Sequence, residues 1–460
     1  MRTPPGVQAS RRTSILGLVT IVVAAGVVPA LAFALVYRYT VDVPYIDEWT
    51  FTRLILGADR GHILWADAFA QRNEHRIFFP ALLILGLSRL GGWSELRETL
   101  FDVGLVTLDL AILWRMIVST LPARTVPYVF LGASLLTFSL VQVETLLWGM
   151  GSEWFVANLS ALFALYVLTL RAPSASNVVV ALGASAVSLF SLSAGLSLLP
   201  VGVLALLLRD PSGWRRSSLW VAGSIVMLAI FLRGFNAHPG FPGRAGELAT
   251  MFPQYVLAFL GGPLGTRNGT QPAEFLGMFS LAVIAIAAIR FGALRARGRS
   301  AEAYVPWLAL CAFVVCDALL AAYGRAGLGI VQATSSRYAT MATDLWFGVI
   351  ALLVLLLADA WKAGRFAVRL VVPAAAVLVC GFAYLFVRAQ FTGFRYIAEF
   401  TSPIQRGMLA VHDFPDPTDE QLSLLCPCPA YLRWSLPALA AAGDPQFEEL
   451  VPVRSSSRAK

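Results

Sequence analysis

The sequence predicts an all-α fold, a polytopic transmembrane bundle of about 11 to 13 helices, with a structured first outer loop that carries interfacial helices. Hydrophobic residues make up 58% of the chain and charged residues 13%, which leaves too little polar surface for a water-soluble domain. Apolar runs long enough to cross the hydrocarbon core recur between Ile15 and Val387. Basic residues form short clusters between these runs, as topology determinants do.

The first apolar run, residues 15–36, follows three arginines and so resembles a signal peptide at first sight. It is longer than the apolar segment of a signal peptide, and no small-residue cleavage site clearly follows it. We therefore expect a retained first helix, preceded by a cytoplasmic tail of residues 1–14.

Further candidate helices follow, several of them short. They are expected at about 77–90, 100–119, 126–148, 153–170, 177–192, 194–208, 217–233, 272–290, 304–323, 338–358 and 370–390. The run from Tyr255 to Leu264 is too short to span and is rich in glycine and proline towards its end. This composition indicates a re-entrant or interfacial element.

The basic clusters predict the orientation of the chain. Those around Arg209 and Arg215, in residues 290–299, and from Lys362 to Arg369 are expected on the cytoplasmic side, with the N-terminus. A transmembrane domain of residues 15–390 would then place four segments outside the membrane. They are loop 38–76, loop 234–271, loop 324–337 and the C-terminal tail 391–460. The sequence leaves the topology between residues 77 and 124 open.

The formal charge of +8 could suggest a nucleic acid partner, but the distribution of the basic residues indicates a lipid bilayer instead. Cys426 and Cys428 flank a proline, and we expect them to be too close for an unstrained disulfide. No second cysteine pair suggests zinc, so the sequence assigns them no role.

The first outer loop holds the densest group of charged residues, interleaved with aromatic ones. Asp47 and Glu48 follow Pro44 soon after the first helix, where a carboxylate can be partly desolvated and close to a lipid headgroup. This is a suitable position for a general base. The alternatives are a solvated interfacial charge or an N-cap of the next helix.

A second polar group, Asn73-Glu74-His75-Arg76, comes directly before an apolar run. At the start of a helix, Asn73 and Arg76 would share one face and offer donors to a phosphate or a sugar hydroxyl. Interfacial side chains that extend to water are the alternative. Metal binding by His62 and His75 is not indicated, because their spacing fits no helical ligand pattern.

Two later segments add candidate ligands. Glu153 begins a helix beside two tryptophans, and it is either a cavity-facing acid or a polar helix end. The loop before residue 338 combines flexible glycines with Arg325, Ser336, Arg337 and Tyr338, which could bind a phosphate or diphosphate. Its glycine spacing fits no nucleotide motif, and a purely structural loop remains an alternative.

Four acids lie inside apolar segments: Asp102, Asp109, Asp317 and Asp344. A carboxylate in hydrocarbon is costly, so each is a candidate functional residue. They could equally pair with Arg115 or Arg325 inside the bundle.

Taken together, the chain resembles the polytopic glycosyltransferases of the GT-C superfamily, membrane enzymes that use polyprenyl-phosphate-linked sugars. The resemblance lies in the first helix, the long acidic outer loop with Asp47-Glu48, its return near Asn73-Glu74-His75-Arg76, and the many further helices. The chain also resembles a bacterial branch of membrane proteins grouped with these transferases. This resemblance lies in Asn73-Glu74-His75-Arg76, Trp148-Gly149 and Ser336-Arg337-Tyr338.

The resemblance implies an inverting transfer at the outer face of a bacterial plasma membrane, from a polyprenyl-phosphate-linked sugar to a glycan or lipid acceptor of the cell envelope. Asp47 or Glu48 would deprotonate the acceptor, and Arg76 and Arg337 would stabilise the leaving phosphate. Some relatives use a divalent cation held by acids, so a cation is possible here. The tail of about 70 residues is shorter than the acceptor-binding domain of many relatives.

Two other functions remain open. The acids in apolar segments suggest a transporter or flippase of a lipid-linked or small polar substrate, although no paired, interrupted helices are evident. A structural or assembly subunit would need none of Asp47, Arg76 and Arg337.

Overall fold

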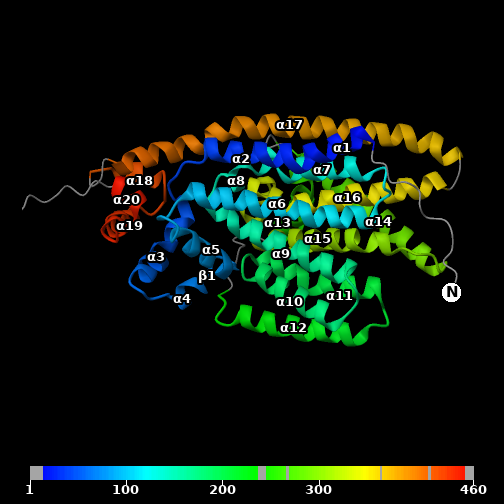
Figure 1. Cartoon of the computed structure of the whole chain (residues 1–460), viewed down its shortest axis with the longest axis horizontal. Helices are drawn as coiled ribbons and strands as arrows, with labels where there is room; N and C mark the ends of the chain where they lie inside the picture. The colour runs from blue at the N-terminus through cyan, green and yellow to red at the C-terminus, as the bar shows by residue number, and fades with distance from the viewer. Residues whose placement is uncertain (1–13, 237–244, 266–268, 363–364, 413–415, 451–460) are drawn as a thin grey trace, which may run out of the picture.

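A computed structural model describes residues 14–236, 245–265, 269–362, 365–412 and 416–450 (Figure 1). Eight helical segments in these residues are long and apolar enough to cross a membrane, which confirms the expected polytopic all-α bundle. They are α1–α2, α7–α8, η4–α9, α12, α14, η7–α15–η8, α16 and the second part of α17. The N-terminal arginines on which the cytoplasmic tail was based lie outside the described residues.

The elements follow one another along the chain, with η marking short 3-10 or π helices. They are α1 (Ile15–Val22), η1 (Val23–Val27), α2 (Val28–Tyr39), η2 (Ile46–Phe51), α3 (Thr52–Asp59), α4 (Trp65–Ala68), β1 (Gln71–Arg72), β2 (His75–Arg76), α5 (Phe78–Ser88), α6 (Glu95–Thr120), α7 (Val126–Thr137), η3 (Leu140–Gln142), α8 (Val143–Leu146), η4 (Gly149–Gly151), α9 (Ser152–Leu170), α10 (Ala175–Leu189), η5 (Ser193–Ser197), α11 (Leu198–Arg209), α12 (Trp214–Leu232), α13 (Ala245–Gly261), η6 (Gly262–Leu264), α14 (Gln271–Ala296), η7 (Glu302–Tyr304), α15 (Val305–Arg325), η8 (Ala326–Leu328), η9 (Ile330–Thr334), α16 (Ser336–Lys362), α17 (Arg365–His412), α18 (Asp419–Ser423), α19 (Pro429–Ala441) and α20 (Pro445–Leu450).

The run at residues 255–264, expected as a re-entrant or interfacial element, forms the end of a helix, α13, followed by the short η6. Glycine residues allow two helices to pack closely at this point. A Cβ atom on Gly277 of α14 would overlap the backbone of Leu257 in α13, and one on Gly261 would overlap the backbone of Ala273. The glycines therefore let α13 and α14 approach closely, as small residues do between membrane helices.

The C-terminal tail and the first loop form one folded unit at one end of the bundle. Residues 40–77 and 416–450, which we call the cap, lie together at the left of Figure 1. Gln446 Nε2 donates to Asp42 O at 2.5 Å, and the ring of Phe447 lies 5.9 Å from that of Trp49. The boundary expected at residue 390 falls inside α17, which continues to His412 and leads into the cap.

Cys426 and Cys428 form a disulfide in the cap, contrary to the expectation from their spacing. The backbone between them is extended enough to bring the two Cα atoms to 5.0 Å, within the usual range for a disulfide. The bridge follows Leu425, whose carbonyl accepts a hydrogen bond from Ile46 N at 2.6 Å.

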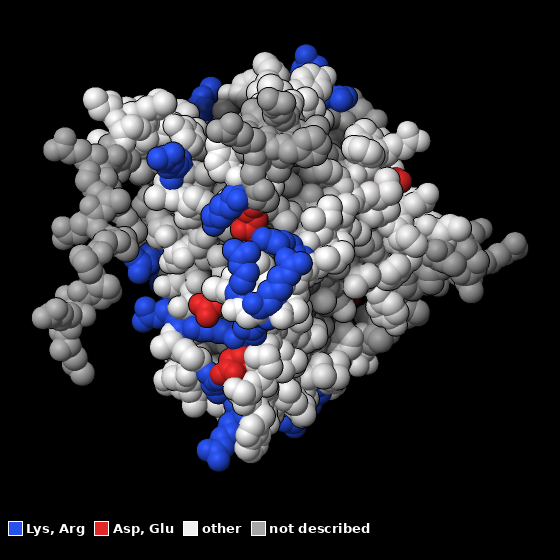
Figure 2. All heavy atoms as spheres, turned by 90° about the vertical axis from the view of Figure 1, so that its right-hand side faces the viewer, with Lys and Arg blue, Asp and Glu red and all other residues white. Residues whose placement is uncertain are grey.

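The opposite end of the bundle is basic. Figure 2 shows this end with Lys and Arg gathered across it and few acidic side chains among them. One ion pair lies within a helix-to-helix contact here, between Arg290 of α14 and Asp359 of α16 at 2.9 Å. The bundle is thus polar at both ends, but the two ends differ in the sign of their charge.

Candidate functional site

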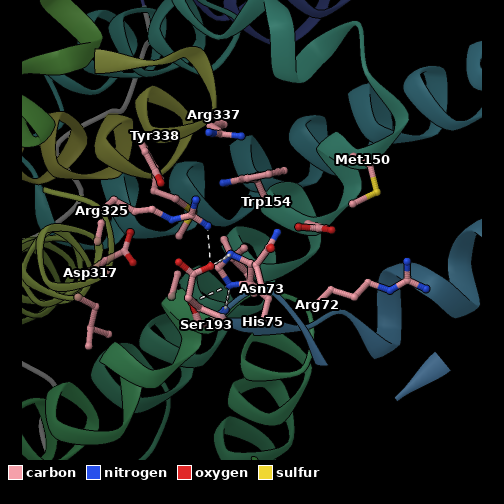
Figure 3. A pocket seen from close by; sticks show the side chains of 18 of the residues that line it. Arg72, Asn73, His75, Met150, Trp154, Ser193, Asp317, Arg325, Arg337 and Tyr338 are labelled. Carbon is pink, nitrogen blue, oxygen red and sulfur yellow. Dashed lines mark hydrogen bonds and ion pairs between the residues drawn. The ribbon is translucent and has the colours of Figure 1, made fainter. Parts of the chain in front are cut away.

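A cavity of about 330 Å³ lies where the cap meets the ends of α9, α15 and α16 (Figure 3). Its size is typical of a ligand pocket. We call it the pocket. Eight of the eleven candidate residues from the sequence line it: Asp47, Asn73, Glu74, His75, Glu153, Arg325, Arg337 and Tyr338. The first loop therefore covers a cavity shared with later helices.

Asp47 reaches the pocket from η2, and its side chain is exposed. The residue before it, Ile46, has a φ of 50°, a conformation that a β-branched residue rarely adopts. The hydrogen bond from Ile46 N to Leu425 O holds this turn against the cap. Such strain persists only where the surroundings fix it, and it is common at functional sites.

A β-hairpin brings the second polar group into the pocket. Arg72 pairs with His75, and Asn73 and Glu74 form the turn between the strands. Asn73 has a φ of 50°, which asparagine tolerates better than most residues. The sequence predicted a helix start here, and the shared helical face of Asn73 and Arg76 does not exist.

Glu74 and His75 connect the hairpin to two other elements. Arg325 Nη2, at the end of α15, lies 2.5 Å from Glu74 Oε2, and His75 Nδ1 lies 2.8 Å from Ser193 Oγ in η5. Burial lowers the pKa of His75 from 6.5 to about 4, and the charges of Arg325 and Arg337 act in the same direction. His75 is therefore neutral at pH 7 and orders the pocket wall by hydrogen bonding.

Arg337 and Tyr338 lie in the first turn of α16. Among the described residues, no carboxylate oxygen lies within 4.0 Å of the Arg337 guanidinium, in contrast to Arg325. The positive end of the dipole of this 27-residue helix points in the same direction. An arginine without an acidic partner at a helix N-terminus is well suited to bind a phosphate.

The remaining charges of the pocket lie on its other walls. Arg72 stacks over the ring of Phe51 at 4.5 Å, and its pKa is lowered by burial, an effect that Glu153 opposes. Glu153 and Asp317 are both buried, and Asp317 lies on the side of Arg325 (Figure 3). The pocket thus alternates acids and arginines.

Two tryptophans form an aromatic wall. The rings of Trp148 and Trp154 lie 6.3 Å apart, and Trp148 Nε1 donates to Tyr45 O at 3.1 Å. Both side chains line the pocket and are largely buried. An aromatic face of this kind can pack against the C–H face of a sugar ring while nearby polar groups bind its hydroxyls.

Three candidate residues lie elsewhere than expected. Glu48 is fully buried behind the pocket, whereas the preceding Asp47 is exposed, and burial raises the pKa of Glu48 to about 7. Arg76 is buried, and its guanidinium donates to the carbonyls of Phe69, Phe231 and Arg233. Ser336 is buried and its Oγ accepts a hydrogen bond from Glu144 N at 3.1 Å, which joins α16 to α8.

The residues of the pocket that were not candidates for substrate binding from the sequence include Arg72, Trp148, Trp154 and Ser193. Arg72 stands beside Asn73, and its position in the hairpin could have indicated it. In the sequence the tryptophans indicate the membrane interface, and Trp148 also belongs to the family resemblance. Ser193 carries no local signal, because only the fold brings it to His75.

The acids of the pocket do not gather into a metal site. Among the described residues, one group of three or more His, Cys, Asp or Glu side chains has its ligand atoms within 4.8 Å of one another. It consists of Glu48, Glu95 and Glu98, behind the pocket. Asp47 does not belong to this group.

No protein-family model matches the sequence, and no curated protein is significantly similar to it. Two solved structures have a similar fold. One is the archaeal oligosaccharyltransferase AglB from Archaeoglobus fulgidus with an inhibitory peptide and a dolichol-phosphate (TM-score 0.48, 14% identity, covering 89% of this chain). The other is the Archaeoglobus fulgidus oligosaccharyltransferase tethered to an acceptor peptide with the NVT sequon (TM-score 0.48, 14% identity, 90% of this chain).

The matched region covers 59% of the length of each of these archaeal chains. The similarity concerns the general arrangement of the helices. The activity of this protein has to be inferred from the residues of its pocket.

Proposed function

We propose that this membrane protein is a glycosyltransferase that moves a sugar from a polyprenyl-phosphate donor to a cell-envelope acceptor. The observation that carries the proposal is the meeting of Asp47 with Arg325, Arg337 and the start of α16 in one pocket. A base, a phosphate-binding group and an aromatic wall are what transfer from a lipid phosphate requires. The basic end in Figure 2 would be cytoplasmic, so the pocket would face the outer side of a bacterial plasma membrane.

In this proposal the reaction is an inverting displacement. Asp47 takes the proton of the acceptor hydroxyl, and the acceptor oxygen forms a bond to the anomeric carbon of the sugar. The bond between that carbon and the phosphate oxygen breaks, and the electron pair leaves with the lipid phosphate. Arg337 stabilises the charge that develops on this phosphate, with Arg325 beside it.

The electrostatics of the pocket supports different roles for its arginines. Arg325 is already paired with Glu74, so it fixes the hairpin and contributes a partly neutralised charge. Arg337 lacks such a partner among the described side chains and can pair with a phosphate at little cost. We therefore assign phosphate binding mainly to Arg337, with Tyr338 as a hydroxyl donor beside it.

The test uses the purified full chain with polyprenyl-phosphate-linked hexoses and pentoses and measures release of the lipid phosphate and formation of a glycoside. Asp47→Asn should abolish transfer while donor binding persists. Asp67→Asn, an exposed acid of the same loop paired with Arg53, is the matched control and should be active. Undiminished transfer by folded Asp47→Asn would refute the role of Asp47.

Transport of a lipid-linked or small polar substrate is the second candidate. Asp109 and Asp344 support it, because both are buried and line a second, small cavity inside the bundle. Proteoliposomes that move a polyprenyl-phosphate-linked sugar across the bilayer without forming a glycoside would favour this function over transfer.

A further inference from the structure

A cluster of three buried acids lies behind the pocket and takes no part in the proposed reaction. Glu48 of the first loop and Glu95 and Glu98 of α6 are 0 to 2% exposed. Each offers a carboxylate oxygen, and these oxygens lie within 4.8 Å of one another. The cluster joins two segments that are distant along the chain.

The third wall of the cluster is the turn at Gly149. A Cβ atom on this glycine would lie 2.5 Å from Glu98 Oε2, 2.9 Å from Glu95 Oε2 and in still closer contact with Glu48 Oε1. Oxygens from all three acids thus converge on one side of the turn. No side chain other than that of glycine fits there.

Several of these oxygens have no hydrogen-bond partner. Both oxygens of Glu98 lack one, as do Oε1 of Glu48 and Oε2 of Glu95. The other two oxygens accept backbone hydrogen bonds, Glu48 Oε2 from Tyr45 N and Glu95 Oε1 from Gly149 N. These four buried oxygens thus accept no hydrogen bond of good geometry from a donor of the described chain, although the Glu48 and Glu95 carboxyls lie within reach of each other and the Trp93 indole lies near Glu98.

No basic side chain neutralises the cluster. Among the described residues, no Lys, Arg or His nitrogen lies within 4.0 Å of these carboxylates. Arg97, which follows in α6, donates to the carbonyls of Leu87 and Gly92 instead. Buried charges without a partner are strongly unfavourable, so the ionised cluster requires a counter-charge, and no basic side chain among the described residues supplies one.

We propose that Glu48, Glu95 and Glu98 bind a hard divalent cation, which ties the first loop, α6 and the turn at Gly149 together. Carboxylate oxygens are the preferred ligands of such ions, at about 2.0 to 2.6 Å. Two oxygens on one ion at about 2.4 Å can be at most about 4.8 Å apart, so oxygens within 4.8 Å of one another can bind the same ion.

The cation has a positioning role. Asp47 precedes Glu48, and Trp148 and Met150, which flank Gly149, both line the pocket. An ion bound at the cluster therefore holds in place two segments that line the pocket, the one with Asp47 and the one from Trp148 to Met150. It contacts none of the residues that take part in the proposed reaction. Its effect is on the stability and order of the cap and does not depend on the identity of the substrate.

The test compares the thermal unfolding of the full chain after EDTA treatment with that after addition of Ca²⁺, Mg²⁺ or Mn²⁺ at constant ionic strength. At a concentration about 100-fold above Kd, at least one ion should raise the melting temperature by about 5 °C, and the rise should saturate. Glu98→Gln should lose this rise and, without metal, should melt no lower than the wild type, because it removes a buried charge. Asp67→Asn should keep the rise.

Terbium provides a second measurement. Trp49 follows Glu48, Trp93 lies two residues before Glu95, and Trp148 precedes Gly149, so these tryptophans can sensitise the luminescence of Tb³⁺ bound there. Sensitised emission that the active divalent ion displaces and that Glu98→Gln lacks would support the site. If Glu98→Gln does not fold, Glu95→Gln replaces it in both measurements.

The proposal is overturned by two results. One is the absence of both a thermal shift and sensitised emission in the wild type, which would mean that the acids are neutralised by protons. The other is an equal thermal shift in the wild type and in a folded Glu98→Gln variant, which would place the ion elsewhere. Neither result bears on glycosyl transfer, which has its own assay.

Discussion

Two groups of carboxylates, one lining the pocket and the other buried behind it, differ in the charges that surround them. The pocket acids stand among arginines: Glu74 pairs with Arg325, and Glu153 lies in the field of Arg72. The cluster of Glu48, Glu95 and Glu98 forms no ion pair with a basic side chain in the part of the chain that the structure describes. The two proposals thus assign neighbouring residues 47 and 48 to different chemistries, the reaction for Asp47 and cation binding for Glu48.

The comparison indicates that the surroundings of an acidic side chain, and not its residue type, determine its role in this protein. Asp47 is exposed to the pocket, while Glu48 is fully buried one residue later. The four predictions below test this division. They run from the largest expected effect to the smallest.

Asp47→Asn should lower the rate of glycosyl transfer by at least about 100-fold, because a general base typically contributes 10²- to 10⁴-fold. Its melting temperature and its response to divalent cations should match the wild type. A comparison of initial rates and thermal unfolding for the same preparations checks this. The division between the two groups would fail if Asp47→Asn lost the cation response as well.

Arg76→Ala should lower the free energy of unfolding by about 3 kcal/mol, because it removes charged donors from three backbone carbonyls, some of them buried. Binding of polyprenyl phosphate per folded molecule should be unchanged. Chemical denaturation and a binding measurement check the two parts. A selective loss of binding at normal stability would restore Arg76 to the site.

Arg337→Gln should weaken binding of polyprenyl phosphate about tenfold, which corresponds to the loss of one charge-assisted hydrogen bond. The melting temperature should change little, since this arginine has no ion-pair partner among the described residues. Arg433→Gln, which interrupts an exposed ion pair with Asp419 in the cap, is a matched control and should bind normally. Equal affinity of both variants would exclude Arg337 from phosphate binding.

His75 should give a small pH effect on stability. Its pKa is about 4 in the folded chain and 6.5 in the unfolded one, so the unfolded chain binds more protons between these values. The stabilisation is complete above pH 6.5 and is lost as the pH falls towards 4. His75→Asn should show a shallower fall in melting temperature over this range, and an equal slope would contradict the buried, neutral histidine.

The bundle could be predicted from the sequence because the bilayer directly determines how long an apolar segment must be and where basic residues cluster. The continuation of α17 past residue 390 could not, since the helix leaves the bilayer and its polar part carries no membrane signal. The α13–α14 contact was missed for a related reason. Gly261 was interpreted as a helix breaker, whereas it is a contact point between helices.

The site was predicted in part for similar reasons. Asp47 and Arg337 are polar residues next to apolar helices, so the end of the bundle brings them together. The roles of Arg76 and Ser336 depend on carbonyl and amide groups from distant segments, which the sequence does not indicate. The cluster was missed because Glu95 and Glu98 stand at the start of a helix, where acids are expected without a ligand.

The length of α17 has a mechanical consequence. Its 48 residues give a rod of about 70 Å, more than twice the thickness of the hydrocarbon layer. Near its end at His412, α17 packs against α18 of the cap and thereby contacts the part of the chain that covers the pocket. A helix of this length adapts to bilayer thickness by tilting, so the lipid composition of the membrane would set the height at which the cap stands above the surface and meets an incoming acceptor.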